Sequence, residues 1–121
     1  MINPQTVLFR LRQLVTLDEE GAENALPLCV LCLEEVKSRL KKNADGNDPR
    51  LAQAAAALAY YRTVLRDAAD SDGTTSFKAG DVTVTRTPAA MLEIAVGIRD
   101  EAFAQASDLL TDRDFLFRQV Q

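Results

Sequence analysis

The chain has 121 residues, of which 47% are hydrophobic and 26% are charged, so a single domain over residues 1–121 can bury a core without disulfides or metals. Its net charge of −4 at pH 7 argues against sequence-specific DNA binding, which usually requires a basic surplus or a basic stripe. No apolar run approaches the roughly 18 residues that cross a bilayer, and the N-terminus lacks a secretory leader, so we expect a cytoplasmic protein.

The first helix is expected from Pro4 to about Val15. Asn3 is a suitable N-cap, and proline is favoured at the first helical position. The apolar residues of this stretch recur at the spacing of one helical face: Val7, Leu8, Leu11, Leu14 and Val15. The stretch from Thr16 to Glu19 has the form of a capping box, so a second helix is expected to begin there with Thr16 as its cap.

The second helix is expected to run to about Lys42, with a kink or break near Pro27, which removes a backbone donor and clashes with the preceding turn. Beyond this point the chain is strongly apolar, and the residues expected to face the core are Leu28, Cys29, Leu31, Cys32, Val36 and Leu40. Glu35 and Arg39 are four residues apart, which favours an ion pair on the surface. Lys41 and Lys42 are favourably placed at the C-terminus of a helix, where cations complement the helix dipole. The alternative is that they belong to a patch that contacts phosphates.

A turn at residues 43–48 precedes a third helix, which Pro49 opens and which is expected to end near Ala69. Its small residues allow another helix to approach closely, so it is expected to be the central core helix. Its broad apolar face contains Leu51, Ala54, Ala55, Leu58, Tyr61, Val64, Leu65 and Ala68.

A fourth helix is expected to begin with Thr87 as its cap and Pro88 as its first residue, and to reach about Leu110. Its apolar stripe contains Met91, Ile94, Ala95, Ile98, Ala102, Ala106, Leu109 and Leu110. The sequence therefore predicts a mainly α fold. The expected architecture is a bundle of about four helices with one β-strand or hairpin arm between the third and fourth helices.

Residues that carry catalysis are scarce in this chain. It has no histidine, which removes the commonest general base and the Ser-His and Cys-His nucleophile pairs. Cys29 and Cys32 form a CxxC pair, but they lie among apolar residues and a zinc site needs further ligands. We expect buried, inert thiols, with redox chemistry and a metal shared between subunits as the alternatives. The carboxylates form no catalytic pair or metal loop, so we expect no enzyme, metal or cofactor.

The arm at residues 76–87 alternates in the manner of a β-strand. Gly80 interrupts the alternation, so the arm is either a small hairpin that turns on Gly80 and Asp81 or one extended segment. A lone hairpin is marginal in water, and an extended segment leaves backbone groups unpaired. Pairing with a neighbouring subunit is therefore favoured, and the alternative is that the arm packs on the helices of its own chain.

Within this arm the sequence reads FKAGDVTVT, with Phe77, Gly80, Asp81, Val82, Thr83, Val84 and Thr85 at fixed spacing. This pattern resembles a motif of the head–tail connector (adaptor) proteins of tailed bacteriophages and prophages. That motif has the form Ser/aromatic-x-x-Gly-Asp-(Val/Tyr)-(Ser/Thr)-Val-(Ser/Thr), and it joins the helical core to the last helix. The order of helices, arm, long helix and short aromatic tail is similar to the family across most of the chain.

The resemblance implies a structural subunit that forms a ring below the capsid portal, extends the DNA channel and meets the next neck or tail protein. Its partners would be copies of itself, the portal protein and the neck or tail protein, with DNA as passing cargo and no membrane. It would act in the cytoplasm of a bacterial host and in the virion. The contact arm would contain Phe77, Gly80, Asp81, Val82, Thr83, Val84, Thr85 and Arg86.

The C-terminal tail, residues 111–121, carries a short aromatic cluster. Many adaptors dock on the portal through an extended terminal segment, and Phe115 and Phe117 would take that role here, unless the tail folds back onto the core. The alternative function is a small helical interaction module, such as a phage tail-assembly chaperone or a regulatory adaptor.

Overall fold

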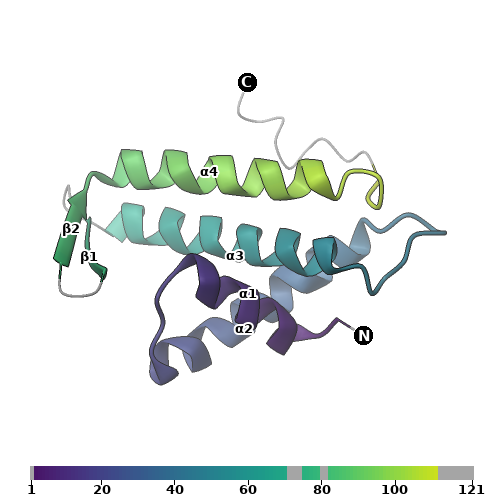
Figure 1. Cartoon of the computed structure of the whole chain (residues 1–121), viewed down its shortest axis with the longest axis horizontal. Helices are drawn as coiled ribbons and strands as arrows, with labels where there is room; N and C mark the ends of the chain where they lie inside the picture. Colours follow the sequence, from purple (N-terminus) through teal and green to yellow (C-terminus); the bar gives the residue numbers. More distant parts are fainter. Residues whose placement is uncertain (1, 71–74, 80–81, 112–121) are drawn as a thin grey trace.

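A computed structural model of the chain describes residues 2–70, 75–79 and 82–111, with side chains over residues 2–69 and 87–111. Four helices make up most of this part, so the predicted mainly α fold is confirmed (Figure 1). The elements are α1 (Pro4–Leu14), α2 (Glu19–Ser38), α3 (Pro49–Asp70), β1 (Thr75–Ala79), β2 (Val82–Arg86) and α4 (Pro88–Gln105).

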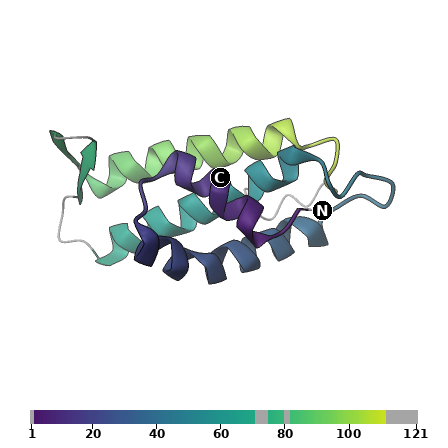
Figure 2. The same cartoon turned by 60° about the horizontal axis from the view of Figure 1, so that its bottom comes forward.

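The helices form two layers around α3. Helix α4 runs back along α3 as an antiparallel neighbour, while α1 and α2 cover the other side of α3 and also pack on each other (Figures 1 and 2). Helix α3 is the element that all three other helices contact. Every residue from Ala54 to Ala59 is almost completely buried, so small side chains allow close approach from several directions and the predicted central helix is confirmed.

Helix α1 begins as the sequence predicts. The side chain of Asn3 accepts a hydrogen bond from the backbone N–H of Thr6 at 3.0 Å, and Pro4 occupies the first helical position. Val7, Leu8 and Leu11 are buried, in agreement with the predicted stripe. A local cap and a local spacing therefore account for the whole helix.

The start of α2 differs from the prediction. Asp18, not Thr16, is the N-cap, and its carboxylate accepts from the backbone N–H of Gly21 at 2.7 Å. The guanidinium of Arg12 donates to the carbonyl of Leu17 at 3.1 Å, which keeps the connecting segment extended for two more residues. A carboxylate also interacts more favourably than a hydroxyl with the positive end of the helix dipole, so the acidic cap has the advantage.

We predicted a kink or a break at Pro27. Helix α2 is continuous from Glu19 to Ser38, so a break is wrong. The proline lies on the exposed side of the helix, where the carbonyls of the preceding turn can tilt toward water. The helix also ends earlier than predicted. Beyond Arg39 the chain forms an isolated antiparallel bridge between Leu40 and Leu110, and the N–H of Lys41 donates to the carbonyl of Leu109 at 2.9 Å.

Helix α3 opens as predicted, because the side chain of Asp48 accepts from the backbone N–H of Arg50 at 2.9 Å. Helix α4 also begins as predicted, since the Thr87 hydroxyl accepts from the N–H of Ala90 at 3.2 Å and Pro88 is the first residue. Its end does not agree with the prediction, because α4 stops at Gln105. Residues 106–110 form turns and the bridge to Leu40 instead, and Ala106, Leu109 and Leu110 among them are buried.

Three residues predicted to face the core are exposed. Leu31 is 59% exposed, Leu65 is 43% exposed and Ile94 is 40% exposed. In two of these helices smaller neighbours are buried instead, namely Cys29 and Cys32 beside Leu31 and Ala95 beside Ile94. Helical spacing therefore predicted these helices correctly, but it predicted burial for three side chains that are exposed.

Candidate functional site

The arm lies at one end of the α3–α4 pair (Figure 1). The structure pairs β1 and β2 as antiparallel strands, with Phe77 opposite Val84, Lys78 opposite Thr83 and Ala79 opposite Val82. The sheet has two strands, and neither strand packs extensively on a helix in the described part of the chain. Each strand therefore has an outer edge, and unpaired strand edges are templates for pairing with another chain.

The predicted contact residues fall in three places. Phe77 is in β1, while Val82, Val84 and their neighbours Thr83, Thr85 and Arg86 are in β2. Gly80 and Asp81, which connect the strands, lie outside the described residues. Phe115 and Phe117 of the predicted docking tail also lie outside them. The role of each residue in assembly therefore stays a prediction.

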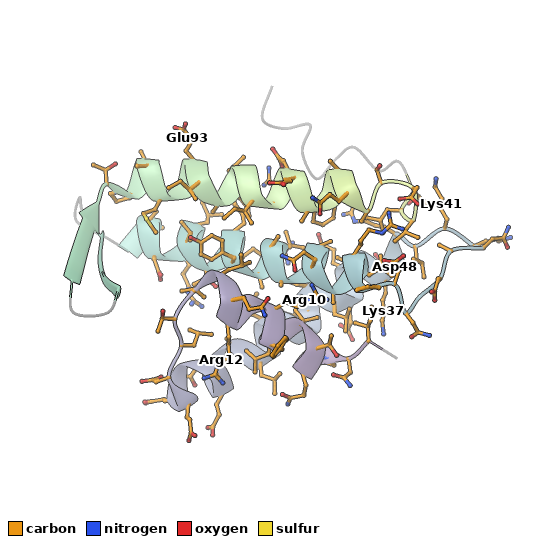
Figure 3. All side chains as sticks on the ribbon, viewed as in Figure 1. Arg10, Arg12, Lys37, Lys41, Asp48 and Glu93 are labelled. Atoms are coloured by element: carbon orange, nitrogen blue, oxygen red, sulfur yellow. The ribbon has the colours of Figure 1, made fainter. Side chains whose placement is uncertain are left out.

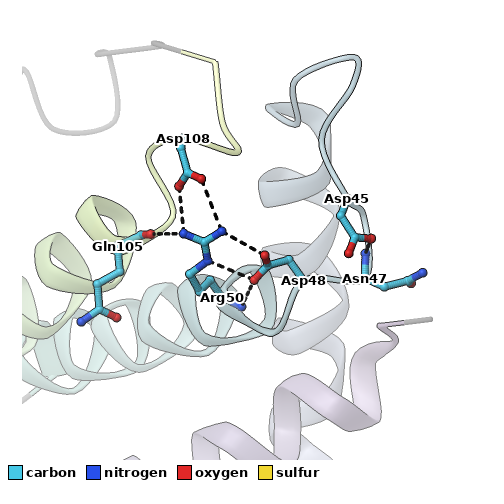
Figure 4. Close-up of polar contacts among 6 residues, drawn as sticks. All are labelled: Asp45, Asn47, Asp48, Arg50, Gln105 and Asp108. Carbon is cyan, nitrogen blue, oxygen red and sulfur yellow. Dashed lines mark hydrogen bonds and ion pairs between the residues drawn. The ribbon is translucent and has the colours of Figure 1, made fainter.

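The other end of the α3–α4 pair is closed by Arg50 (Figure 4). Its guanidinium donates to Asp48 at 3.0 Å, to Asp108 at 2.9 Å and to the backbone carbonyl of Gln105 at 3.0 Å. Hydrogen bonds from Arg50 lower the pKa of Asp48 below its usual range. This junction joins the start of α3 to the segment after α4. All its charges are paired, so it holds the two helices in register and offers no free acid or base.

A shallow hollow of about 620 Å³ lies between α1, α3 and α4. It is lined by Arg10, Leu14, Pro49, Arg50, Gln53, Ile98, Glu101, Ala102 and Gln105. Arg10 donates to the side chain of Gln53 at 3.2 Å, which ties α1 to α3 inside it. Glu101 is the one carboxylate among these lining residues, and the set contains no cysteine, serine, threonine or lysine. The lining therefore lacks the nucleophile and paired carboxylates that acyl transfer or glycoside hydrolysis requires.

The two cysteines are buried, which confirms that part of the prediction. Both have no exposed surface, and burial raises the pKa of each thiol because it disfavours the charged thiolate. The pKa of Cys32 rises to about 11, although the Arg62 guanidinium lies 3.7 Å from its sulfur and acts in the opposite direction. Neutral thiols without access to solvent are poor nucleophiles. Among the described residues, no group of three or more Cys, Asp or Glu side chains is arranged to hold a metal ion.

An ion-pair network between α2 and α3 was not predicted. Arg62 donates to Glu35 at 2.6 Å, and Arg39 lies 3.6 Å from the other oxygen of the same carboxylate. The predicted surface pair of Glu35 and Arg39 is therefore a partly buried network, since Arg39 is 5% exposed. The spacing of four residues predicted the pair of Glu35 and Arg39. Nothing local in the sequence points to Arg62, because it is distant along the chain.

The burial of Arg99 and the exposure of Phe9 were also not predicted from the spacing of residues in the sequence. Arg99 is 2% exposed, and its guanidinium lies 4.4 Å from the centre of the Tyr61 ring, a cation–π contact between α4 and α3. Phe9 is 65% exposed on α1, outside the predicted apolar stripe. The first residue strengthens the core, and the second leaves a large apolar side chain in contact with solvent.

Comparisons of the chain with protein-family models, with curated proteins and with solved structures find no match. No helix in the described part of the chain is long and apolar enough to cross a membrane. The functional conclusion therefore depends on the geometry of the arm and of the helical surfaces.

Proposed function

We propose that the chain is a structural subunit of a head–tail connector of a tailed phage or prophage, and that its arm pairs with a neighbouring copy to form a ring. The ring would join the portal to the neck or tail and extend the DNA channel. The observation that supports this most is a two-stranded hairpin at one end of a helical domain, with both outer edges unpaired within the described sheet. Its residues carry the motif that resembles the connector family.

The physics of an isolated hairpin supports a contact role. Two strands alone bury little surface and are marginally stable, so addition of a strand from another chain lowers their free energy. A contact in which the arm of one copy meets a different surface of the next copy is heterologous, and such contacts close into rings when the rotation allows it. The arm between α3 and α4 thus provides a directional contact.

The charge of the chain is consistent with a DNA conduit. The net charge of −4 leaves no surplus of cations to hold phosphates tightly, which is suitable for DNA that must pass through. The proposal assigns no catalytic step to this protein. It places the chain in the bacterial cytoplasm during assembly and in the virion afterwards, and it assigns portal docking to Phe115 and Phe117.

The register allows a sharp test of the arm. In a two-residue hairpin, Ala79 and Val82 exchange hydrogen bonds, so the N–H groups of the next pair, Lys78 and Thr83, point to the outer edges. Thr83→Pro and Lys78→Pro each remove one outward donor without removing a bond between β1 and β2. Thr83→Ala and Lys78→Ala keep the donors and serve as matched controls.

The mass of the protein is measured by light scattering over a range of concentrations, with and without portal protein. We expect a closed oligomer in the native chain and in the alanine variants. Deletion of residues 77–86 and at least one of the proline variants are expected to yield monomers with unchanged helical content. A native chain that stays monomeric throughout, or proline variants and a deletion that assemble normally, contradicts the proposed function.

A further inference from the structure

The hollow between α1, α3 and α4 contains two charged side chains that lack an opposite charge. Three charged residues line it: Arg10, Arg50 and Glu101. Arg50 is paired with two carboxylates, whereas the ion pairs of the described residues include neither Arg10 nor Glu101. A cation on α1 and an anion on α4 thus line the same hollow without pairing with each other.

Arg10 gives the α1–α3 side of the hollow an excess of hydrogen-bond donors. The side chain is half-buried, and its one hydrogen bond to the described residues goes to the side-chain oxygen of Gln53 at 3.2 Å. The other N–H groups of the guanidinium and the NH2 group of Gln53 have no acceptor within the same part of the chain. Loss of hydration costs a cation free energy when no opposite charge replaces the water, so a carboxylate bound here stabilises Arg10.

Glu101 provides an acceptor on the α4 side. Its carboxylate accepts one long hydrogen bond, from the NH2 group of Gln105 at 3.5 Å, and its second oxygen accepts none from the described residues. The residue is exposed, so a Lys or Arg side chain can reach it without a rearrangement of the helices.

The rest of the lining is largely apolar. Leu14 and Ile98 line the hollow and are partly buried against the core, and Pro49 and Ala102 also belong to the lining. The hollow therefore offers apolar contact beside a cation and an anion. Because it is shallow, it does not enclose a free small molecule as a typical ligand pocket does. A group that projects from a larger partner fits it better.

The charges restrict the chemistry of that group. Asp48 and Asp108 bind Arg50, and together with Glu101 they place three carboxylates in or beside the hollow. These carboxylates repel phosphates, so nucleic acid is a poor occupant. A ligand that carries cations alone is opposed by Arg10. Charge complementarity therefore selects a ligand with one acidic and one basic group.

We propose that this hollow binds a segment of another protein in which an acidic and a basic side chain lie close together. The acidic side chain bonds to Arg10 and Gln53, and the basic side chain pairs with Glu101. The chain between them contacts Leu14 and Ile98. The hollow lies toward the end of the α3–α4 pair that is opposite the arm, so this contact adds a partner and does not depend on the proposed ring.

The probe is a fluorescein-labelled peptide of about eight residues with blocked termini, in which Glu-Leu-Lys is flanked by glycine and serine. A second probe carries the three residues in reverse order, because the hollow assigns each charge to a helix but does not fix the direction of the bound chain. For each order, two comparison peptides replace Glu by Gln or Lys by Gln. Binding to the full chain is followed by fluorescence anisotropy.

Single substitutions remove the two charges of the hollow one at a time. These are Arg10→Gln and Glu101→Gln. Arg12→Gln on α1 and Glu93→Gln on α4 are the matched controls, because both residues are exposed and neither lines the hollow. Figure 3 shows Glu93 on the side of α4 that faces away from α3, and Arg10 where α1 meets α3. Circular dichroism checks that all four variants fold.

We expect at least one order of the peptide to bind with a dissociation constant below about 1 mM. Arg10→Gln should weaken its binding by about threefold to tenfold and cause no further loss for the peptide with Gln in place of Glu, which has no carboxylate to pair. Glu101→Gln should act in the same way on the lysine of the peptide. The controls should stay within about twofold.

Absence of binding for both orders at about 1 mM overturns the inference, and so does an equal loss of binding in the control and hollow variants. Displacement of the peptide by a single-stranded oligonucleotide, abolished in Arg10→Gln, would assign the hollow to phosphates instead. An oligomer of the native chain that Arg10→Gln/Glu101→Gln disrupts and the control pair preserves would assign it to a second copy. Thr83→Pro and Lys78→Pro separate the two proposals, because at least one should prevent ring assembly and both should leave peptide binding intact.

Discussion

Replacement of Pro27 by alanine is expected to stabilise the protein. Pro27 lies well inside α2, which is continuous around it, and its side chain is exposed, so removal of the ring leaves no cavity. Alanine restores the backbone N–H that bonds to the carbonyl of Glu23, four residues earlier, and relieves the clash between the ring and the preceding turn. The substitution thus improves the helix at a position where little packing is lost.

The size of the effect follows from the position. Proline costs about 3 kcal/mol more than alanine in a helix interior, and the exposed side of α2 can absorb part of that cost because its carbonyls reach water. We therefore expect the free energy of unfolding to rise by about 1–3 kcal/mol. For a domain of this length, each kcal/mol raises Tm by about 4 °C, so the expected increase is about 4–12 °C.

Urea unfolding followed by circular dichroism measures the change, and Asn24→Ala is the control. Asn24 is also exposed and lies in the same helix, so its replacement reports the gain from helix propensity alone, below about 0.7 kcal/mol. A Pro27→Ala variant that is no more stable than Asn24→Ala would refute this reasoning. It would mean that α2 needs the geometry imposed by proline in order to pack on α1 and α3.

Four further outcomes are expected. Leu58→Ala should lose about 2–5 kcal/mol in urea unfolding because Leu58 is 1% exposed, whereas Leu31→Ala should lose less than about 0.5 kcal/mol. Cys29 and Cys32 should resist a thiol reagent at neutral pH in the native state and react on unfolding. Because the unfolded thiol ionises first, the stability that Cys32 contributes should fall as pH rises from about 9 toward 11, and Cys32→Ala should flatten this profile in urea midpoints. Thr87→Ala should lose about 1 kcal/mol in the same assay, since it removes the cap of α4.

The starts of three helices were predictable because caps act locally. Asn3, Asp48 and Thr87 each accept a hydrogen bond from an N–H two or three residues later, and a proline follows each of them directly. Both signals lie within one turn of the helix. The exception is α2, where we predicted Thr16 as the cap and the structure has Asp18, next to the Leu17 carbonyl that accepts a hydrogen bond from Arg12 of α1.

The ends of α2 and α4 were not predictable in this way. Both helices stop before the residues that join them, where Leu40 pairs with Leu110 and the N–H of Thr111 donates to the carbonyl of Arg39 at 2.6 Å. These partners are far apart in the sequence. Apolar spacing continued through both segments, so it predicted longer helices, while pairing between the segments ended them.

The sequence by itself determined that the protein is mainly helical and which segments are helices, because helical spacing and caps act over a few residues. Only the tertiary structure decided which apolar side chains are buried. Leu31 and Ile94 lie on helices of the right pattern yet are exposed, and Arg99 is buried against Tyr61. Burial depends on which surfaces of distant helices meet, and the spacing of apolar residues within one helix does not determine those surfaces.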